Sequence, residues 1–115
     1  MRVLLADDDA GIRLVVSLNM ERRGWQVDTA TDGDDALVRA RGAAYDVIVL
    51  DQLMPGQTGI EVAEALDRDV PIIIYSAFLD RDVEERANEL GCPTVGKADI
   101  PELLAMIETF GARAS

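Results

Sequence analysis

An unbroken apolar run, Val47 to Leu50, leads directly into Asp51, and the breaker pair Pro55-Gly56 follows it. A short apolar run bounded by turn residues is typical of a strand that is buried on both faces. In open α/β sheets, ligands bind beyond the carboxyl ends of such strands. We therefore expect Asp51 to lie where a sheet places its functional groups, although an acidic residue there could equally begin a solvated loop.

A second acidic cluster, Asp7-Asp8-Asp9, follows the first apolar run of the chain. If the two runs are parallel neighbours, Asp7 and Asp8 converge on Asp51. Two carboxylates ~4 Å apart repel by roughly 4 kcal/mol at an effective dielectric of about 20, so a compensating cation is expected. Hard oxygen ligands at a partly open site suit Mg²⁺, which keeps several of its waters. The sequence therefore predicts an acidic pocket that holds Mg²⁺.

The composition limits the class of protein. A chain of 115 residues with 49% hydrophobic residues predicts one domain over residues 1–115, with no effector domain. The net charge of −11 argues against nucleic acid and anionic membrane as direct partners and favours basic protein surfaces. The single Cys92 and the lack of an apolar run of ~20 residues predict a cytoplasmic protein. Because the chain contains no histidine, histidine-based catalysis and histidine metal ligands are excluded.

Five apolar runs alternate with five stretches of helical periodicity. The predicted strands cover residues 2–6, 25–30, 47–51, 71–76 and 92–95, and the predicted helices cover 10–23, 33–41, 59–66, 80–90 and 100–110. This alternation predicts an α/β fold, a flavodoxin-like (βα)5 doubly wound parallel sheet with strand order 2-1-3-4-5. In that order the first and third strands are adjacent, so Asp7, Asp8 and Asp51 meet at the switch point of the sheet.

Two of the predicted helices carry specific expectations about packing. In the first helix, we expect Ile12, Val15, Val16 and residues 18–20 to form one broad inward face. The helix over residues 80–90 is highly charged, and its apolar stripe is thin. We expect this helix to pack weakly and to move easily.

Two further strand ends complete the polar set, because Ser76-Ala77 closes the fourth strand and Lys97 closes the fifth. A hydroxyl and an ammonium group near a metal-bound carboxylate suit an anionic group attached to that carboxylate. Aspartate can act as a nucleophile towards phosphorus and form an aspartyl phosphate, and Mg²⁺ assists such a transfer. Lys97 would supply a charge to one phosphoryl oxygen and Ser76 a hydrogen bond to another.

With these motifs, the chain resembles the receiver domain of two-component response regulators over nearly its whole length. The segment Leu4 to Asp9 is similar to the family's acidic pair after the first strand, and Asp51 to Gly56 is similar to its phosphoacceptor loop. Ser76-Ala77 and Lys97 match the family's Thr/Ser-Ala and lysine. The resemblance implies that Asp51 is the phosphoacceptor. It also implies a set of Mg²⁺ ligands, namely Asp8 directly, Asp7 mainly through metal-bound water, Asp51, and the Leu53 backbone carbonyl.

The resemblance implies a function as well. We expect a phosphorylation-activated switch that accepts a phosphoryl group from a histidine kinase or phosphotransfer protein and acts on a downstream protein target. Such a protein is not an enzyme, although it catalyses its own phosphoryl transfer and slow dephosphorylation. A homodimer through the face between the fourth and fifth helices is a further expectation. Leu53 and Phe78 occupy the positions that govern access of hydrolytic water, and because both are apolar we expect a long-lived phosphorylated form.

The chain departs from the family pattern near its fifth strand. Thr94 occupies the position, three before the lysine, that usually carries an aromatic residue, and Ala98 follows Lys97 where the family has proline in a cis bond. A non-proline cis bond costs roughly 3–4 kcal/mol, so this loop is either strained or rebuilt. In the family, the hydroxyl residue moves towards the phosphoryl group and the aromatic ring swings inward behind it. Thr94 has no ring, so we expect the structural response to phosphorylation to shift to the loop at residues 78–82 and the helix that follows it.

Other classes of function fit the sequence less well. An aspartate-nucleophile phosphohydrolase of the haloacid-dehalogenase type would need an acid-base Asp where Leu53 stands, and it would need room for a cap domain. A flavodoxin would need a phosphate-binding loop after the first strand, where three aspartates stand instead. A receiver-like module that binds partners without phosphorylation would be marked by loss of the acceptor, the acidic pair or the lysine. All of these residues are present.

Overall fold

The structure is a computed structural model that describes residues 1–66 and 69–114. Within these residues, one sheet contains five parallel strands in the order β2-β1-β3-β4-β5, as the sequence predicts for a flavodoxin-like (βα)5 fold. The strands are β1 (Arg2–Ala6), β2 (Gln26–Ala30), β3 (Val47–Asp51), β4 (Ile72–Ser76) and β5 (Thr94–Gly96).

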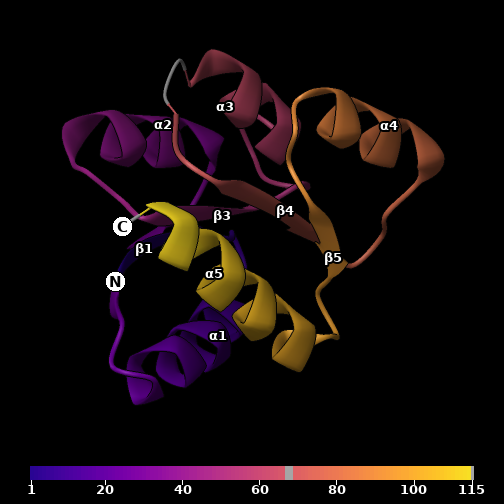
Figure 1. Ribbon diagram of the computed structural model, residues 1–115. Helices are drawn as coiled ribbons and strands as arrows, with labels where there is room; N and C mark the ends of the chain where they lie inside the picture. Colours follow the sequence, from indigo (N-terminus) through magenta and orange to yellow (C-terminus); the bar gives the residue numbers. More distant parts are fainter. Residues whose placement is uncertain (67–68, 115) are drawn as a thin grey trace.

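Helices cover both faces of this sheet. Figure 1 shows α2, α3 and α4 on one face and α1 and α5 on the other. The core is divided in the same way, because side chains that alternate along each strand belong to two separate apolar clusters. The helices are α1 (Ala10–Arg22), α2 (Gly33–Gly42), α3 (Gly59–Ala65), α4 (Arg81–Glu89) and α5 (Ile100–Ala114).

Most element boundaries agree with the sequence prediction to within one residue, but β5 and α5 differ more. The predicted strand at residues 92–95 begins too early, because the Cys92 N–H donates to the carbonyl of Ala87 in α4. Pro93 has no N–H to give to a sheet. The strand therefore starts at Thr94. The last helix continues to Ala114 rather than ending at Phe110.

The predicted inward face of α1 is partly wrong. Val16 and Met20 are buried, but Val15 is 50% exposed and Leu18 is 43% exposed. Successive residues of a helix are turned by about 100°, so positions four apart share a stripe, whereas Val15 and Leu18 point away from it. The helix thus packs on the sheet through a narrow stripe and leaves apolar side chains on its outer surface.

Side-chain caps define where the helices begin. Asp9 is the N-cap of α1 and accepts a hydrogen bond from the Ile12 N–H at 3.0 Å. Thr58 and Glu61 form a reciprocal capping box at α3. These caps determine how each loop leaves a strand end and enters the next helix.

The junction between β3 and α3 is packed closely behind Asp51. The Gly59 N–H donates to the Gln52 carbonyl at 3.2 Å, and the Gln52 side chain accepts from the Ile60 N–H at 2.9 Å. A Cβ atom at Gly59 would lie only 2.7 Å from the Asp51 backbone oxygen. Glycine at this position therefore lets α3 start directly against the end of β3.

We expect Gly59→Ala to lower the free energy of unfolding by about 2 kcal/mol, because a methyl group forced against backbone must displace β3 or α3. Urea denaturation of the parent and the variant measures this loss. The matched control is Gly42→Ala at the end of α2, where a Cβ would meet nothing within 4 Å. Equal stability of the two variants would contradict the close-packing argument.

Candidate functional site

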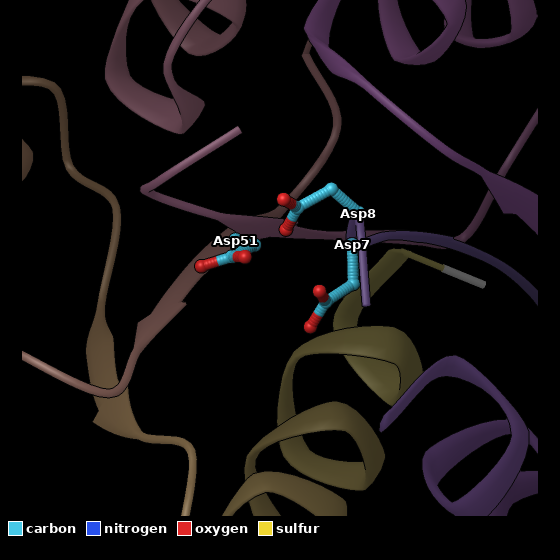
Figure 2. A group of neighbouring side chains, drawn as sticks. All are labelled: Asp7, Asp8 and Asp51. Atoms are coloured by element: carbon cyan, nitrogen blue, oxygen red, sulfur yellow. The ribbon is translucent and has the colours of Figure 1, made fainter. Parts of the chain in front are cut away.

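Three carboxylates meet at the carboxyl ends of β1 and β3. These strands are direct neighbours, with Ala6 opposite Leu50, so the residues that follow them reach the same edge of the sheet. One oxygen from each of Asp7, Asp8 and Asp51 lies within 4.8 Å of the others. Figure 2 shows the three side chains around one common region. Asp7 and Asp51 are buried, whereas Asp8 is exposed to solvent.

Lys97 supplies the positive charge at this edge. It follows β5, and its backbone N–H donates to the Ser76 carbonyl at 3.0 Å, which fixes it beside the end of β4. Its Nζ donates to Asp51 Oδ2 at 2.8 Å and lies 3.0 Å from Asp7 Oδ2. Burial by itself would lower the pKa of Lys97, but the two carboxylates outweigh it and raise the pKa above its ordinary value. The lysine therefore stays charged and bridges two buried carboxylates.

Asp51 is held in an unfavourable environment for a negative charge. Burial raises the pKa of its carboxyl group, and the charge of Asp7 adds to this effect. Hydrogen bonds from Lys97 and from the Leu53 N–H favour the charged form, but the pKa of Asp51 still rises to about 6. A carboxylate with this environment gains from any further cation that approaches it.

Asp7 is held more firmly by its hydrogen bonds. Its Oδ1 accepts from the Asp9 N–H at 2.8 Å, and its Oδ2 accepts from the Tyr75 hydroxyl at 2.5 Å as well as facing Lys97. Burial alone would raise the pKa of Asp7, but these donors together hold it below its ordinary value. Two neighbouring buried carboxylates thus have opposite pKa shifts, because their donors differ in number.

Tyr75 is the residue of this site that the sequence analysis did not identify. It stands in the apolar strand β4, where its ring belongs to the buried cluster on the α1 and α5 side of the sheet. A signal was present in the sequence, since a buried tyrosine hydroxyl normally requires a hydrogen-bond partner. The pattern alone gives no indication of which partner that is.

Ser76 lies at the same edge, but its hydroxyl is engaged with the loop that follows β4. The hydroxyl donates to the Phe78 carbonyl at 3.0 Å and accepts from the Phe78 N–H at 3.2 Å. These bonds close a small ring of contacts within the loop. The hydroxyl must leave the Phe78 carbonyl before it can donate to a group attached to Asp51.

The remaining candidate residues have side chains that lie outside the buried acidic cluster. Leu53 and Phe78 are 62% and 75% exposed, and Leu53 contributes its N–H to Asp51. Thr94 is half-buried at the start of β5, opposite Ile74.

The loop after β5 is rebuilt rather than strained. Among residues 1–66 and 69–114 no peptide bond is cis, so the Lys97–Ala98 bond is trans. The Asp99 N–H donates to the Gly96 carbonyl at 3.0 Å, which closes a tight turn into α5. Of the two predicted possibilities, the rebuilt loop is the one observed.

The donor set fits a hard divalent cation. Three carboxylates provide oxygen ligands, and the exposure of Asp8 leaves one side of the site open to water. Mg²⁺ combines one or two protein carboxylates with several waters, which matches a partly open cluster of this kind. Asp7, Asp8 and Asp51 are therefore the residues that could hold Mg²⁺.

Comparison with known proteins identifies the class. Residues 3–108 match the response regulator receiver domain, and the chain belongs to this family. Receiver domains are the phosphorylation switches of two-component systems. They bind Mg²⁺ at an acidic cluster, interact with histidine kinases and downstream effectors, and are not generally classed as enzymes.

Two curated relatives show how much of a longer protein the chain matches. It is 35% identical over 117 residues to the transcriptional regulatory protein PdtaR of Mycobacterium tuberculosis, covering 97% of this chain and 57% of that protein. It is 38% identical over 78 residues to ResD of Bacillus subtilis, covering 66% of this chain and 32% of ResD. The chain therefore spans about a third to just over half of the length of these relatives.

Solved structures agree in fold. The receiver domain of the Francisella response regulator 1452 superimposes with a TM-score of 0.92 at 30% identity, covering 99% of this chain and 98% of that one. The response regulator TrrA of Thermotoga maritima, solved in complex with Mg²⁺ and BeF, gives a TM-score of 0.85 at 28% identity, covering 95% and 97%. Within the residues that the structure describes, no helix is both long and apolar enough to cross a membrane.

The raised pKa of Asp51 leads to a test of stability against pH. A folded-state pKa of about 6, above the ordinary 3.8, means that the contribution of the Asp51 carboxyl group to stability is fully present below about pH 4 and is lost as the pH rises through 6. We therefore expect Asp51→Asn, neutral at every pH, to stabilise the metal-free protein by about 3 kcal/mol at pH 8. Urea denaturation in EDTA at pH 4 and pH 8 measures the difference.

The exposed carboxylate of Asp82 in α4 provides the matched control. Asp82→Asn removes the same charge from the surface and should give no comparable gain at pH 8. If Asp51→Asn gives the same gain at pH 4 as at pH 8, burial of the Asp51 charge is not the cause.

Proposed function

We propose that residues 1–115 work as one receiver unit, a phosphorylation-activated signalling switch in which Asp51 accepts a phosphoryl group from a histidine kinase or phosphotransfer protein. The observation that carries this proposal is the position of Asp51, buried at the end of β3 between an acidic pair and a lysine. In the transfer, an oxygen of Asp51 forms a bond to phosphorus. The bond between phosphorus and the donor breaks, and its electron pair leaves with the donor.

The neighbouring residues have separate roles in this proposal. Asp8 and Asp51 would hold Mg²⁺ directly and Asp7 mainly through metal-bound water, and the Leu53 backbone carbonyl would be a further ligand by family resemblance. When bound, Mg²⁺ neutralises negative charge on the phosphoryl oxygens. Lys97 lies 2.8 Å from Asp51 Oδ2, so its ammonium group is close enough to pair with a phosphoryl oxygen after transfer.

An apolar surface beside the pocket supports docking of the phosphodonor protein. A groove of about 380 Å³ runs between α1 and the start of α5, and Val15, Ile100 and Lys97 are among its lining residues. Further exposed apolar side chains lie on α1, in the loop between β3 and α3 and in the loop between β4 and α4, namely Leu14, Leu18, Leu53 and Phe78. Such a surface next to the acceptor suits an apolar partner face that presents a phosphohistidine to Asp51.

The hydrogen bonds of Ser76 support a route from the pocket to the surface. When Ser76 donates to a phosphoryl oxygen, it gives up its bond to the Phe78 carbonyl and frees the loop between β4 and α4. The helix α4 that follows buries only Ala87 completely among its residues Arg81–Glu89. A helix with so few buried contacts shifts at low energetic cost. The side chain of Thr94 is too small to take part, so the response passes through this loop and α4. A homodimer through the face between α4 and α5 is a candidate output of this route.

We expect acetyl phosphate with Mg²⁺ to add one phosphoryl group to the protein, detected by intact mass, and Asp51→Asn to abolish the addition because the nucleophile is gone.

Asp8→Asn should weaken Mg²⁺ binding in calorimetry, because one oxygen ligand is lost. Asp9→Asn is the control, since asparagine still caps α1.

Labelling that survives Asp51→Asn would refute the assignment of the acceptor. A parent protein that binds Mg²⁺ but is never labelled would instead favour a module that binds partners without phosphorylation.

The output route is tested with beryllofluoride, which mimics the phosphoryl group. We expect hydrogen exchange to change across residues 78–90 when Mg²⁺ and beryllofluoride are added, because Ser76 releases the loop. In Ser76→Ala the same addition should leave residues 78–90 nearly unchanged. Changes confined to residues 51–56 in the parent would rule out this route.

A further inference from the structure

Tyr75 connects the buried core to the acidic pocket. Its side chain is completely buried among apolar residues on the α1 and α5 side of the sheet, and its hydroxyl donates to Asp7 Oδ2 at 2.5 Å. The Lys97 ammonium group lies 5.4 Å from the centre of the Tyr75 ring. Tyr75 therefore contacts two of the charged groups of the pocket without being exposed to solvent.

One oxygen atom is shared between these two donors. Asp7 Oδ2 accepts from the Tyr75 hydroxyl and also faces Lys97 at 3.0 Å, while the other oxygen of Asp7 accepts from the Asp9 N–H. Lys97 in turn is divided between Asp7 and Asp51. The lysine thus has two carboxylate partners, and Asp7 keeps a second donor at the oxygen that the lysine contacts.

We propose that Tyr75 is a positioning residue for phosphoryl transfer, holding the Asp7 carboxylate in place so that Lys97 can leave it for the incoming phosphoryl group. The inference rests on the proposed function. As Lys97 moves, Asp7 Oδ2 loses its cation, and a buried carboxylate without a donor at that oxygen is costly. The Tyr75 hydroxyl remains, so Asp7 stays oriented and the lysine is not confined to it.

The chain offers a matched control for this bond. It contains two tyrosines, and the hydroxyl of the other, Tyr45, donates to Asp28 Oδ2 at 2.7 Å. Tyr45 lies just before β3 and Asp28 lies on the edge strand β2, away from the pocket. Tyr45→Phe and Tyr75→Phe therefore each remove one tyrosine–aspartate hydrogen bond and keep the ring, but only Tyr75→Phe touches the acidic pocket.

The first test is the rate of Asp51 phosphorylation by acetyl phosphate at saturating Mg²⁺. Removing a group that orients a metal-site ligand typically costs 10–100-fold, and we expect Tyr75→Phe to lower the maximal rate about tenfold. Tyr45→Phe should stay within about twofold of the parent. In an Asp7→Asn background, Tyr75→Phe should cause no further loss, because both changes act on the same carboxylate.

The second test does not depend on phosphorylation or on a stable Tyr75 variant. Tyrosine labelled with ¹³C at Cζ gives one signal for each of the two rings, and Tyr45→Phe assigns them. In EDTA, Asp7→Asn should move the Tyr75 signal and leave the Tyr45 signal in place. Adding Mg²⁺ and beryllofluoride to the parent should also move the Tyr75 signal alone.

Several results would overturn the inference. These are a Tyr75→Phe rate within twofold of the parent, a loss that excess Mg²⁺ restores, additive losses with Asp7→Asn, and a Tyr75 signal that Asp7→Asn does not move. A parent protein that acetyl phosphate never labels would overturn the proposed function as well. A labelled parent with an equally fast Tyr75→Phe variant would overturn the role of Tyr75 alone.

Discussion

The bridge that Lys97 makes between Asp7 and Asp51 is the interaction on which the rest of the pocket depends. Two buried carboxylates beside each other would repel strongly in a medium of low dielectric, and the lysine offsets that repulsion from the end of a third strand. The bridge requires β1, β3 and β5 to end at one edge of the sheet. The parallel strand order provides this, because all carboxyl ends then point the same way.

The compensation is incomplete, and this incompleteness is what makes the site chemically useful. Asp7 has enough donors to hold its pKa below the ordinary value, whereas the pKa of Asp51 rises to about 6. The fold thus supplies enough hydrogen-bond donors for the charged form of Asp7 but too few for the charged form of Asp51. A site of this kind reduces stability locally in exchange for affinity towards a cation, and functional sites commonly show this conflict with the rest of the fold.

The fold and the main charged residues could be predicted because they depend on features that are local in the sequence. Apolar runs mark the strands, caps such as Asp9 mark the helices, and the residue after each run must lie at the sheet edge. The sequence could not determine which groups are bonded at that edge. The choice of Tyr75 for Asp7 and of Ser76 for Phe78 depends on side-chain rotamers and on the register between strands distant in the sequence. The exposure of Val15 depends on how α1 is rotated against the sheet.

The contrast between the two faces of β4 bears on how a signal could leave the pocket. Tyr75 lies in the core and is surrounded by large apolar side chains, so a movement there would disturb many contacts at once. The Ser76 hydroxyl is bonded to the backbone of Phe78 in a short loop, which leads to a helix with little buried surface. Asp51 is opposite Tyr75 in the register of β3 and β4, and Ser76 follows directly, so a charge placed on Asp51 lies near both residues. The energetic cost of a response is far lower on the Ser76 side. Tyr75 is therefore suited to the part of the site that stays fixed, and the loop after Ser76 to the part that moves. A conformational switch needs one rigid element against which another element shifts.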